Sequence, residues 1–295
     1  MSAFQNILSP IDFSPFARRA LDHALALARV EGSRLTVLYV APSVSTVVAA
    51  IESPFLLPTL YAQDDLDRFR DDVRRFVEES ATDVPVVCEV VEGHPAQVIA
   101  ALAADRGADL VVMGTHGRTG FDRLVLGSVT ERVLRQAPCS VLVVTRPRDA
   151  AAAPSVFSRI LCAVDFSPAS MKAIEVSQRI ATAHHARVSL VHAVERPSPY
   201  DPVMAGVLAA SGEPGSSPAV SARTRLSALA EAMPGGAEAI VSEGKPYRAV
   251  LDAAEERRAD LIVVGAHGGP LGAYAFGSTT NQIVRQATCP VLVAR

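Results

Sequence analysis

The strongest constraint on the fold of this chain is an internal duplication. Residues 6–15 (NILSPIDFSP) match residues 159–168 (RILCAVDFSP), so that Asp12 corresponds to Asp165. Further segments match in the same order, 92–117 with 243–268 and 135–143 with 285–293. Self-similarity of this kind indicates two copies of one folding unit. The chain is therefore expected to divide into a domain at 1–146, a linker rich in Ala and Pro at 147–156, and a domain at 157–295.

Short apolar runs alternate with segments of helical spacing in the first repeat. The runs are nearly unbroken, as in parallel strands buried on both faces, and lie at 7–8, 35–40, 84–91, 110–113 and 141–144. One helix should begin at Ser14 and Pro15, because Ser caps helices and Pro suits the first helical position. Other helices are expected at 65–80, 96–106 and 128–136. The alternation predicts an α/β fold in which each repeat is a doubly wound, five-stranded parallel sheet. We take the strand order to be 3-2-1-4-5, one of those found in such sheets.

Composition and charge exclude several classes of protein. Hydrophobic residues make up 49% of the chain, which is enough to fill two cores. The formal net charge of −3 gives no reason to expect nucleic acid as a partner. The N-terminus lacks a signal-peptide pattern and no apolar run approaches the ~20 residues that span a bilayer, so we expect no membrane contact and a cytoplasmic location. The four cysteines lack C-x-x-C spacing and are expected to be buried thiols.

Two loops are candidates for a binding site. In doubly wound sheets, ligands bind beyond the carboxyl ends of the strands, where the strand order reverses. The loop after strand one contains Asp12, and the loop after strand four runs from Gly114 to Thr130. Its glycines, Gly114, Gly117 and Gly127, permit positive φ and close backbone approach, and Ser128 and Thr130 begin a helix. Such a helix start is suited to phosphate, although the glycines could merely turn a loop and Ser128 merely cap the helix.

Charged residues in these loops allow more than one role. Asp12 could accept hydrogen bonds from a ribose or help to hold a metal ion, or it could simply stabilise the turn that precedes the helix. Arg118 and Arg123 could neutralise phosphate, although exposed arginines are commonly just solvated. His116 recurs as His267, but neither has a further ligand at metal-binding spacing, so no metal site is expected.

Both halves resemble the universal stress protein family in its tandem form. The motif G-x2-G-x9-G-[ST], at Gly114, Gly117, Gly127 and Ser128, is similar to that of the family's ATP-binding branch. The resemblance implies an adenine nucleotide alpha hydrolase-like fold and binding of ATP, alone or with Mg²⁺. It implies that the glycine motif wraps the phosphates, Asp12 reaches the ribose, and the backbone near Val40 and Met113 borders the adenine. By this resemblance the nucleotide site of the first repeat comprises Pro10, Ile11, Asp12, Val40, Met113, Gly114, His116, Gly117, Arg118, Gly127, Ser128, Val129 and Thr130.

The second repeat departs from this pattern. Eight residues separate Gly268 from Gly277, whereas nine separate Gly117 from Gly127, and no counterparts of Arg118 and Arg123 are present. The shorter loop would aim its amides differently, so we expect weaker nucleotide binding there, or a degenerate structural half. The candidate residues of this second site are Asp165, Gly265, Gly268, Gly277, Ser278 and Thr279.

Three functions remain open at this level. The chain has neither a Walker lysine motif nor a Gly-x-Ser-x-Gly elbow, which favours an ATP-binding stress-response regulator over an enzyme. The alternatives are a slow Mg-dependent ATPase, with Ser128 or Thr130 at the γ-phosphate, and a nucleotide-free scaffold. A protein partner of unknown identity is expected to contact a nucleotide-dependent surface. Residues 41–61 and 193–219 could form a lid or a partner surface.

Strand five of each repeat would be a sheet edge, which proteins generally cover. In the family, edge strands pair across a two-fold axis, and the resemblance implies that the two repeats do so within one chain. We therefore expect a pseudo-dimer, and further homodimerisation of the chain stays open.

Overall fold

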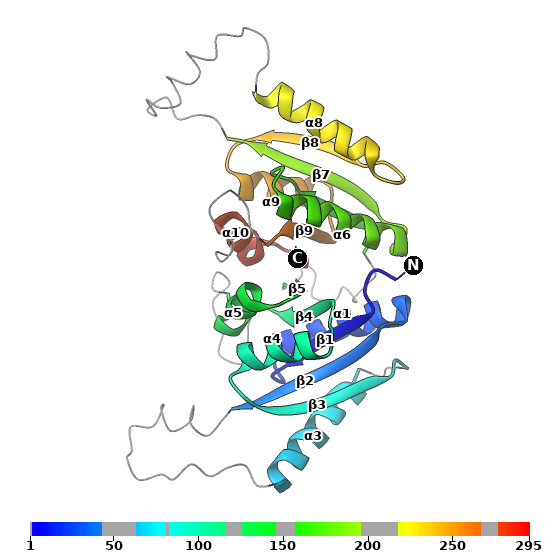
Figure 1. Cartoon of the computed structure of the whole chain (residues 1–295), viewed down its shortest axis with the longest axis vertical. Coiled ribbons are helices and arrows are strands. Elements are labelled where there is room, and N and C mark those ends of the chain that lie inside the picture. The colour runs from blue at the N-terminus through cyan, green and yellow to red at the C-terminus, as the bar shows by residue number, and fades with distance from the viewer. Residues whose placement is uncertain are drawn as a thin grey trace, which may run out of the picture.

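Each repeat of the computed structural model is a five-stranded parallel sheet with helices on both faces (Figure 1). The structure describes residues 2–42, 63–80, 83–115, 126–145, 157–195, 218–266 and 277–295. The first repeat contains β1 (Asn6–Ile11), α1 (Pro15–Glu31), β2 (Arg34–Pro42), α3 (Gln63–Glu78), β3 (Val86–Gly93), α4 (Pro95–Asp105), β4 (Leu110–Gly114), α5 (Ser128–Gln136) and β5 (Ser140–Val144). The second contains β6 (Arg159–Ala163), α6 (Pro168–His184), β7 (Arg187–Val194), α8 (Pro218–Ala232), β8 (Glu238–Glu243), α9 (Pro246–Glu256), β9 (Leu261–Gly265), α10 (Ser278–Gln286) and β10 (Val291–Ala294).

The predicted strand order is confirmed, and the two sheets join into one. The order is β3-β2-β1-β4-β5-β10-β9-β6-β7-β8. All pairings are parallel except β5 with β10, which are antiparallel and cover each other's edges. The repeats therefore form a pseudo-dimer within one chain, as the resemblance implied. The predicted linker, 147–156, and most of 41–61 and 193–219 lie outside the described residues.

Local sequence explains where α1 begins and ends. The Ser14 side chain accepts a hydrogen bond from the Ala17 N–H at 3.1 Å, and Pro15 is the first helical residue, as predicted. Gly32 ends the helix in the left-handed conformation, with φ of 70°. The second repeat uses the same start at Ser167 but ends α6 with His185 at φ of 55°.

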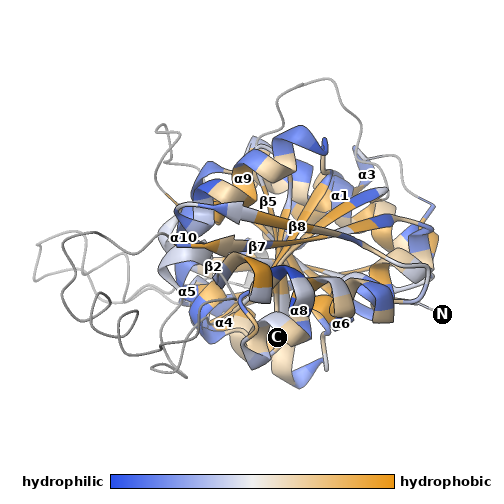
Figure 2. Cartoon of the chain, turned by 90° about the horizontal axis from the view of Figure 1, so that it is seen from above, coloured by the Kyte–Doolittle hydropathy of each residue, from blue (hydrophilic) through white to orange (hydrophobic). Residues whose placement is uncertain are grey.

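The core is divided by the sheet into two apolar layers. One cluster packs α1, α3, α6 and α8 on one face, and the other packs α4, α5, α9 and α10 on the opposite face. Both clusters run through both repeats. The central strands are buried on both sides, whereas the outermost strands, β3 and β8, are largely half-buried. Apolar residues accordingly concentrate on the strands, and polar residues on the outward helix surfaces (Figure 2). No helix among the described residues has the length and apolar character needed to cross a membrane.

Candidate functional site

The predicted switch point brings together Asp12 and the described ends of the second candidate loop. β1 lies between β2 and β4, and all three run parallel, so their carboxyl ends meet at one edge of the sheet. Asp12 follows β1, Gly114 ends β4, and Gly127 precedes α5, which begins beside them. In the second repeat Asp165, Gly265 and Gly277 occupy the same positions.

The residue after each aspartate adopts a rare backbone conformation that the sequence did not reveal. Phe13 has φ of 64° and Phe166 has φ of 62°, in the left-handed region that bulky residues avoid. Aromatic packing offsets the cost of this conformation, because the Phe13 ring lies 4.9 Å from the Tyr39 ring. The Phe166 ring lies 4.6 Å from the His192 ring. This backbone turns sharply at the sheet edge and presents the preceding aspartate there.

Both aspartates take part in this turn. Asp12 Oδ1 accepts the Ser14 N–H at 3.0 Å, and Asp165 Oδ1 accepts the Ser167 N–H at the same distance. The turn-stabilising alternative considered for Asp12 is therefore present. Asp165 is exposed and Asp12 is half-buried, so the turn contact leaves both carboxylates at the surface of the site.

The glycines that end β4 and β9 are required for packing rather than for positive φ. A Cβ on Gly114 would lie 2.9 Å from Phe16 Cβ, and one on Gly265 would lie 2.7 Å from the carbonyl carbon of Ala169. Strand ends and helix starts thus touch backbone to backbone. Gly127 has φ of −58° and Gly277 has φ of −59°. The prediction of positive φ is wrong for Gly114 and Gly127, whereas close approach is confirmed for Gly114, against α1. Gly265 makes the same close approach to α6.

The starts of α5 and α10 carry no side-chain cap. The capping residues are Gly127 and Gly277, and neither can offer a side-chain cap hydrogen bond to the first-turn amides. Ser128 is therefore the first helical residue and not the cap, which corrects the capping alternative. First-turn amides have no partner within their own helix, so two uncapped helix starts with positive dipole ends face the switch points.

The threonine in each helix start has a structural role. Thr130 Oγ1 donates to the Gly114 carbonyl at 2.9 Å, and Thr280 Oγ1 donates to the Gly265 carbonyl at 3.1 Å. Both threonines are buried. Because these hydroxyl protons tie helix to strand, Thr130 is not a donor to a γ-phosphate, and of the two hydroxyls considered for that role only the exposed Ser128 fits.

A cavity of about 210 Å³ lies at the switch point of the second repeat. Its polar wall includes Asp165, Ser278 and Thr279, and its apolar wall includes Val191 and Val264. Ala193, which corresponds to Val40, also lines it. The expected residues of the second site thus converge as far as the structure describes them.

Several predicted residues of the first site lie on the flanking elements. Pro10 and Ile11 are buried at the end of β1, Val40 and Met113 are buried on β2 and β4, and Val129 is half-buried in α5. His116, Gly117, Arg118 and, in the second repeat, Gly268 lie outside the described residues.

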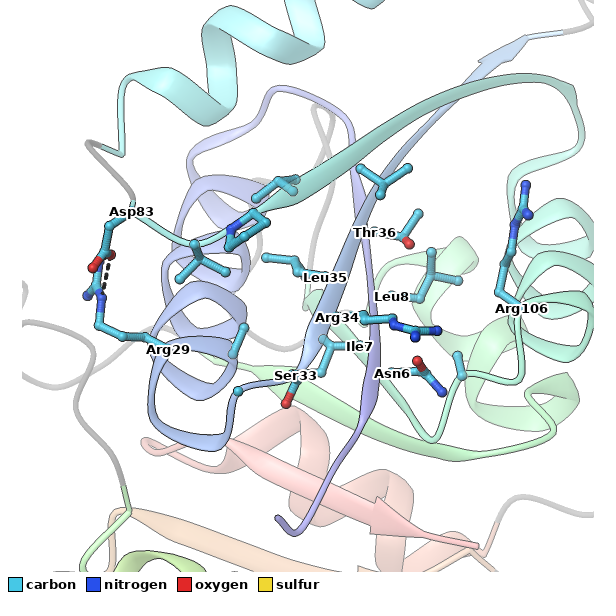
Figure 3. Close-up of a pocket in the computed structure, with 17 residues that line it drawn as sticks. Asn6, Ile7, Leu8, Arg29, Ser33, Arg34, Leu35, Thr36, Asp83 and Arg106 are labelled. Atoms are coloured by element: carbon cyan, nitrogen blue, oxygen red, sulfur yellow. Dashed lines mark hydrogen bonds and ion pairs between the residues drawn. The ribbon is translucent and has the colours of Figure 1, made fainter.

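A larger cavity, of about 590 Å³, lies at the opposite end of the first repeat (Figure 3). Arg29 and Arg106 line it, but Arg29 pairs with Asp83 at 2.7 Å and Arg106 with Glu89 at 3.1 Å. The cavity adjoins the amino ends of β1 and β2, where parallel sheets do not usually bind ligands. The switch-point sites are therefore the better candidates despite the smaller volume.

No group of three or more metal-ligating side chains occurs among the described residues. Cys139 and Cys162 are buried and Cys88 and Cys289 are partly buried, so burial of the thiols is complete for only two of the four. Burial raises the pKa of Cys162 to about 12, which makes it a poor nucleophile.

Comparison with known proteins places this chain in a family. A universal stress protein from Thermus aquaticus is 36% identical over 147 residues, covering 48% of this chain and all of that protein. Universal stress protein MJ0531 of Methanocaldococcus jannaschii is 34% identical over 145 residues, covering 49% of this chain and 84% of its own length.

A crystal structure of a universal stress protein from Archaeoglobus fulgidus matches the whole chain and 97% of its own, with a TM-score of 0.65 and 20% identity, which supports the fold. The sequence model of the universal stress protein family matches residues 3–145 and again residues 157–295. With one match in each repeat, the chain belongs to the universal stress protein family, in its tandem form.

Proposed function

We propose that this universal stress protein binds an adenine nucleotide, ATP alone or with Mg²⁺, and that binding changes a surface recognised by a protein partner. The family supports a stress-response role. The observation that carries the nucleotide proposal is the repeated, uncapped start of α5 and α10 beside an aspartate at the switch point. Backbone amides and a helix dipole stabilise phosphate, and a carboxylate accepts hydrogen bonds from ribose.

The described residues of the second site fit each part of a nucleotide. The amides of Ser278 and Thr279 would hold phosphate, Asp165 would accept from the ribose, and Ala193 and Val264 would border the base. Mg²⁺ is commonly held by one or two carboxylates together with substrate phosphates, so a single aspartate is compatible with Mg·ATP. The 210 Å³ cavity is smaller than the ~300–1,000 Å³ of typical ligand pockets, so residues beyond its described lining would have to complete the site.

We place the tighter site in the first repeat. Its helix start has the same geometry as that of the second, and its loop adds Arg118 and Arg123, which the second repeat lacks. Two cations beside a phosphate chain increase affinity through charge-assisted hydrogen bonds. The glycine spacing of the first repeat also resembles that of the family's ATP-binding branch, whereas the loop of the second repeat is one residue shorter.

Binding is favoured over hydrolysis on the chemistry of the described residues. Phosphoanhydride hydrolysis requires a group that orients water. The Thr130 hydroxyl proton is bonded to the Gly114 carbonyl, which leaves Asp12 as the described side chain that would have to orient water. If the protein were instead a slow ATPase, phosphate would accumulate with time and Asp12→Ala would abolish its release.

The test is calorimetric titration of nucleotide-stripped protein with Mg·ATP. Ser128→Glu and Ser278→Glu form a matched pair of variants. Each change adds a negative charge at an exposed first helical position, which suits the helix dipole but repels phosphate.

We expect Ser128→Glu to remove the tighter binding event and Ser278→Glu to leave it unchanged. Equal losses of nucleotide binding in the two variants would mean that the two sites are equivalent. No binding by the folded wild-type protein would refute the proposal and favour a nucleotide-free scaffold.

A further inference from the structure

The junction between the repeats contains residues that contact their own counterparts. In the β5·β10 pair, Leu142 lies opposite Leu292, which occupies the same place in the second repeat. Glu31, the last residue of α1, contacts His184, the last residue of α6. In a two-fold assembly only residues at the axis meet their own counterparts. The pseudo-two-fold axis therefore passes through both pairs.

The strand edges alone do not decide which repeats pair. Each edge presents the same Val-Leu-Val sequence, at 141–143 and at 291–293. Two first repeats from different chains could form the same ladder, and so could two second repeats. Beyond the covalent link between the repeats, any preference for pairing within one chain must come from side chains near the axis that differ between the repeats.

The Glu31–His184 pair is such a difference, and it is buried. Glu31 Oε1 and His184 Nε2 are 2.7 Å apart, and the two side chains are 1% and 0% exposed. Burial raises the pKa of Glu31, but hydrogen bonds from His184 and the Phe4 N–H outweigh it, and the pKa lies below its usual value. Glu31 is therefore a carboxylate, and His184 Nε2 donates to it.

Further contacts hold the carboxylate in place. Glu31 Oε2 accepts the Phe4 N–H at 2.6 Å and the Ser2 hydroxyl at 3.1 Å. His184 Nδ1 has no hydrogen-bond partner among the described residues, so Glu31 provides its one described hydrogen bond.

Other charged groups around the axis are equally asymmetric. Phe4 and Phe157 are counterparts, but Arg179 lies 5.8 Å from the Phe4 ring, whereas the His23 ring stacks 6.4 Å from Phe157. Arg179 also donates to the Ala3 carbonyl. Arg19 is near His23 and depresses its pKa further.

The opposite side of the junction is asymmetric as well. Arg295, after β10, donates to the Leu134 carbonyl near the end of α5 at 2.6 Å. Its counterpart in the first repeat is Thr145, whose buried hydroxyl has no partner among the described residues.

We propose that the Glu31–His184 pair selects pairing between the two repeats of one chain over pairing with the like repeat of a second chain. Pairing of two first repeats would bury two Glu31 carboxyls at hydrogen-bond distance, where both cannot ionise without a large cost. Pairing of two second repeats would bury two His184 imidazoles without a carboxylate. Only unlike repeats bury a matched pair.

The first test is a double-mutant cycle in the full chain. His184→Glu and Glu31→His each create a like pair, and the double swap Glu31→His with His184→Glu restores an unlike pair. Breaking a buried pair commonly changes the unfolding equilibrium by ~100-fold or more. We expect the folding equilibrium constant of each single variant, measured by urea unfolding, to fall by about this factor. The equilibrium constant of the swap should be at least ~10-fold higher than that of either single variant.

The control is Glu78→His, the same chemical change at an exposed helical position, which should have little effect. In His184→Glu the two carboxyls would share a proton, so its stability relative to the wild type should rise as the pH falls from ~8 to ~5. A swap no better than the worse single variant, or a His184→Glu variant whose stability changes with pH as that of the wild type does, would overturn the proposal. If a single variant fails to fold, the test is whether the swap restores the soluble expression that the single variant has lost.

A mixing experiment tests partner choice directly. Glu31→His chains carry two histidines at the axis and His184→Glu chains carry two glutamates, so each repeat finds its opposite only in the other chain. Two matched contacts would then replace two mismatched ones, which shifts the equilibrium toward the two-chain assembly by ~10⁴-fold. The covalent link between the repeats of one chain opposes this shift with an effective concentration of ~1 mM. The two variants refolded together should form a 1:1 dimer by light scattering at micromolar concentration, which neither forms alone. Recovery of two monomers would refute selection by this pair.

Discussion

Replacing His23 should make the protein less sensitive to acid. His23 belongs to α1, and its imidazole stacks on the ring of Phe157 from the second repeat. The ring centroids are 6.4 Å apart and the interplanar angle is 13°. Burial, with a smaller contribution from Arg19, lowers its pKa from 6.5 to about 4. Between these values the unfolded chain binds a proton that the native chain does not, so the free energy of unfolding falls as the pH falls.

The magnitude follows from the two pKa values. At ~1.4 kcal/mol for each pH unit between them, the full loss is ~3 kcal/mol, and ~2 kcal/mol of it is expected between pH 6.5 and about 5. This is a substantial part of the ~5–15 kcal/mol typical of domain stability. The Glu31 contribution belongs to lower pH, because the pKa of Glu31 lies below 4.5.

The assay is urea unfolding of the wild type and His23→Gln at a series of pH values. The wild type should lose ~2 kcal/mol more than His23→Gln over this range, and the exposed His94→Gln should behave as the wild type. The comparison uses the slope with pH, since His23→Gln also changes packing against Phe157. Parallel curves for wild type and His23→Gln would refute the reasoning.

Two further predictions concern packing. Gly265→Ala should cost ~1–3 kcal/mol, because the new Cβ would meet the Ala169 backbone at 2.7 Å, and the urea midpoint should fall at unchanged slope. A midpoint as high as that of the exposed Ser278→Ala would contradict it. Burial raises the pKa of Cys162 to about 12, so iodoacetamide at pH ~8 should label Cys162 far more slowly in the native than in the unfolded chain. Equal rates would show that the site opens readily.

Much of the fold follows from local sequence. The duplication and the alternation of strand and helix were predictable, because strands buried in a parallel sheet leave unbroken apolar runs. The strand order was taken from the orders common in doubly wound sheets, and the structure confirms it. Ser14 and Pro15 identified the start of α1, because capping depends on residues adjacent in the chain. Element ends were less certain: α3 begins and ends two residues before the expected 65–80, and β3 begins at Val86 rather than at 84.

The candidate site was located by sequence, but its internal roles were not. The importance of Gly114 depends on how closely β4 approaches Phe16, and the Thr130 hydroxyl is occupied by a carbonyl 16 residues away. The left-handed Phe13 is held by rings from other elements. These roles come from contacts between distant segments, which no local pattern specifies.

The repeat pattern in the sequence by itself determined that the chain folds as two like halves. The tertiary structure decided which surfaces of those halves meet, and it placed Glu31 against His184 across 153 residues of chain. The reason is physical: strand and helix propensities act between neighbours, whereas the two-fold arrangement depends on the register of β5 on β10 and the packing of α1 beside α6. Only that arrangement shows that the two helix-ending residues form one buried pair.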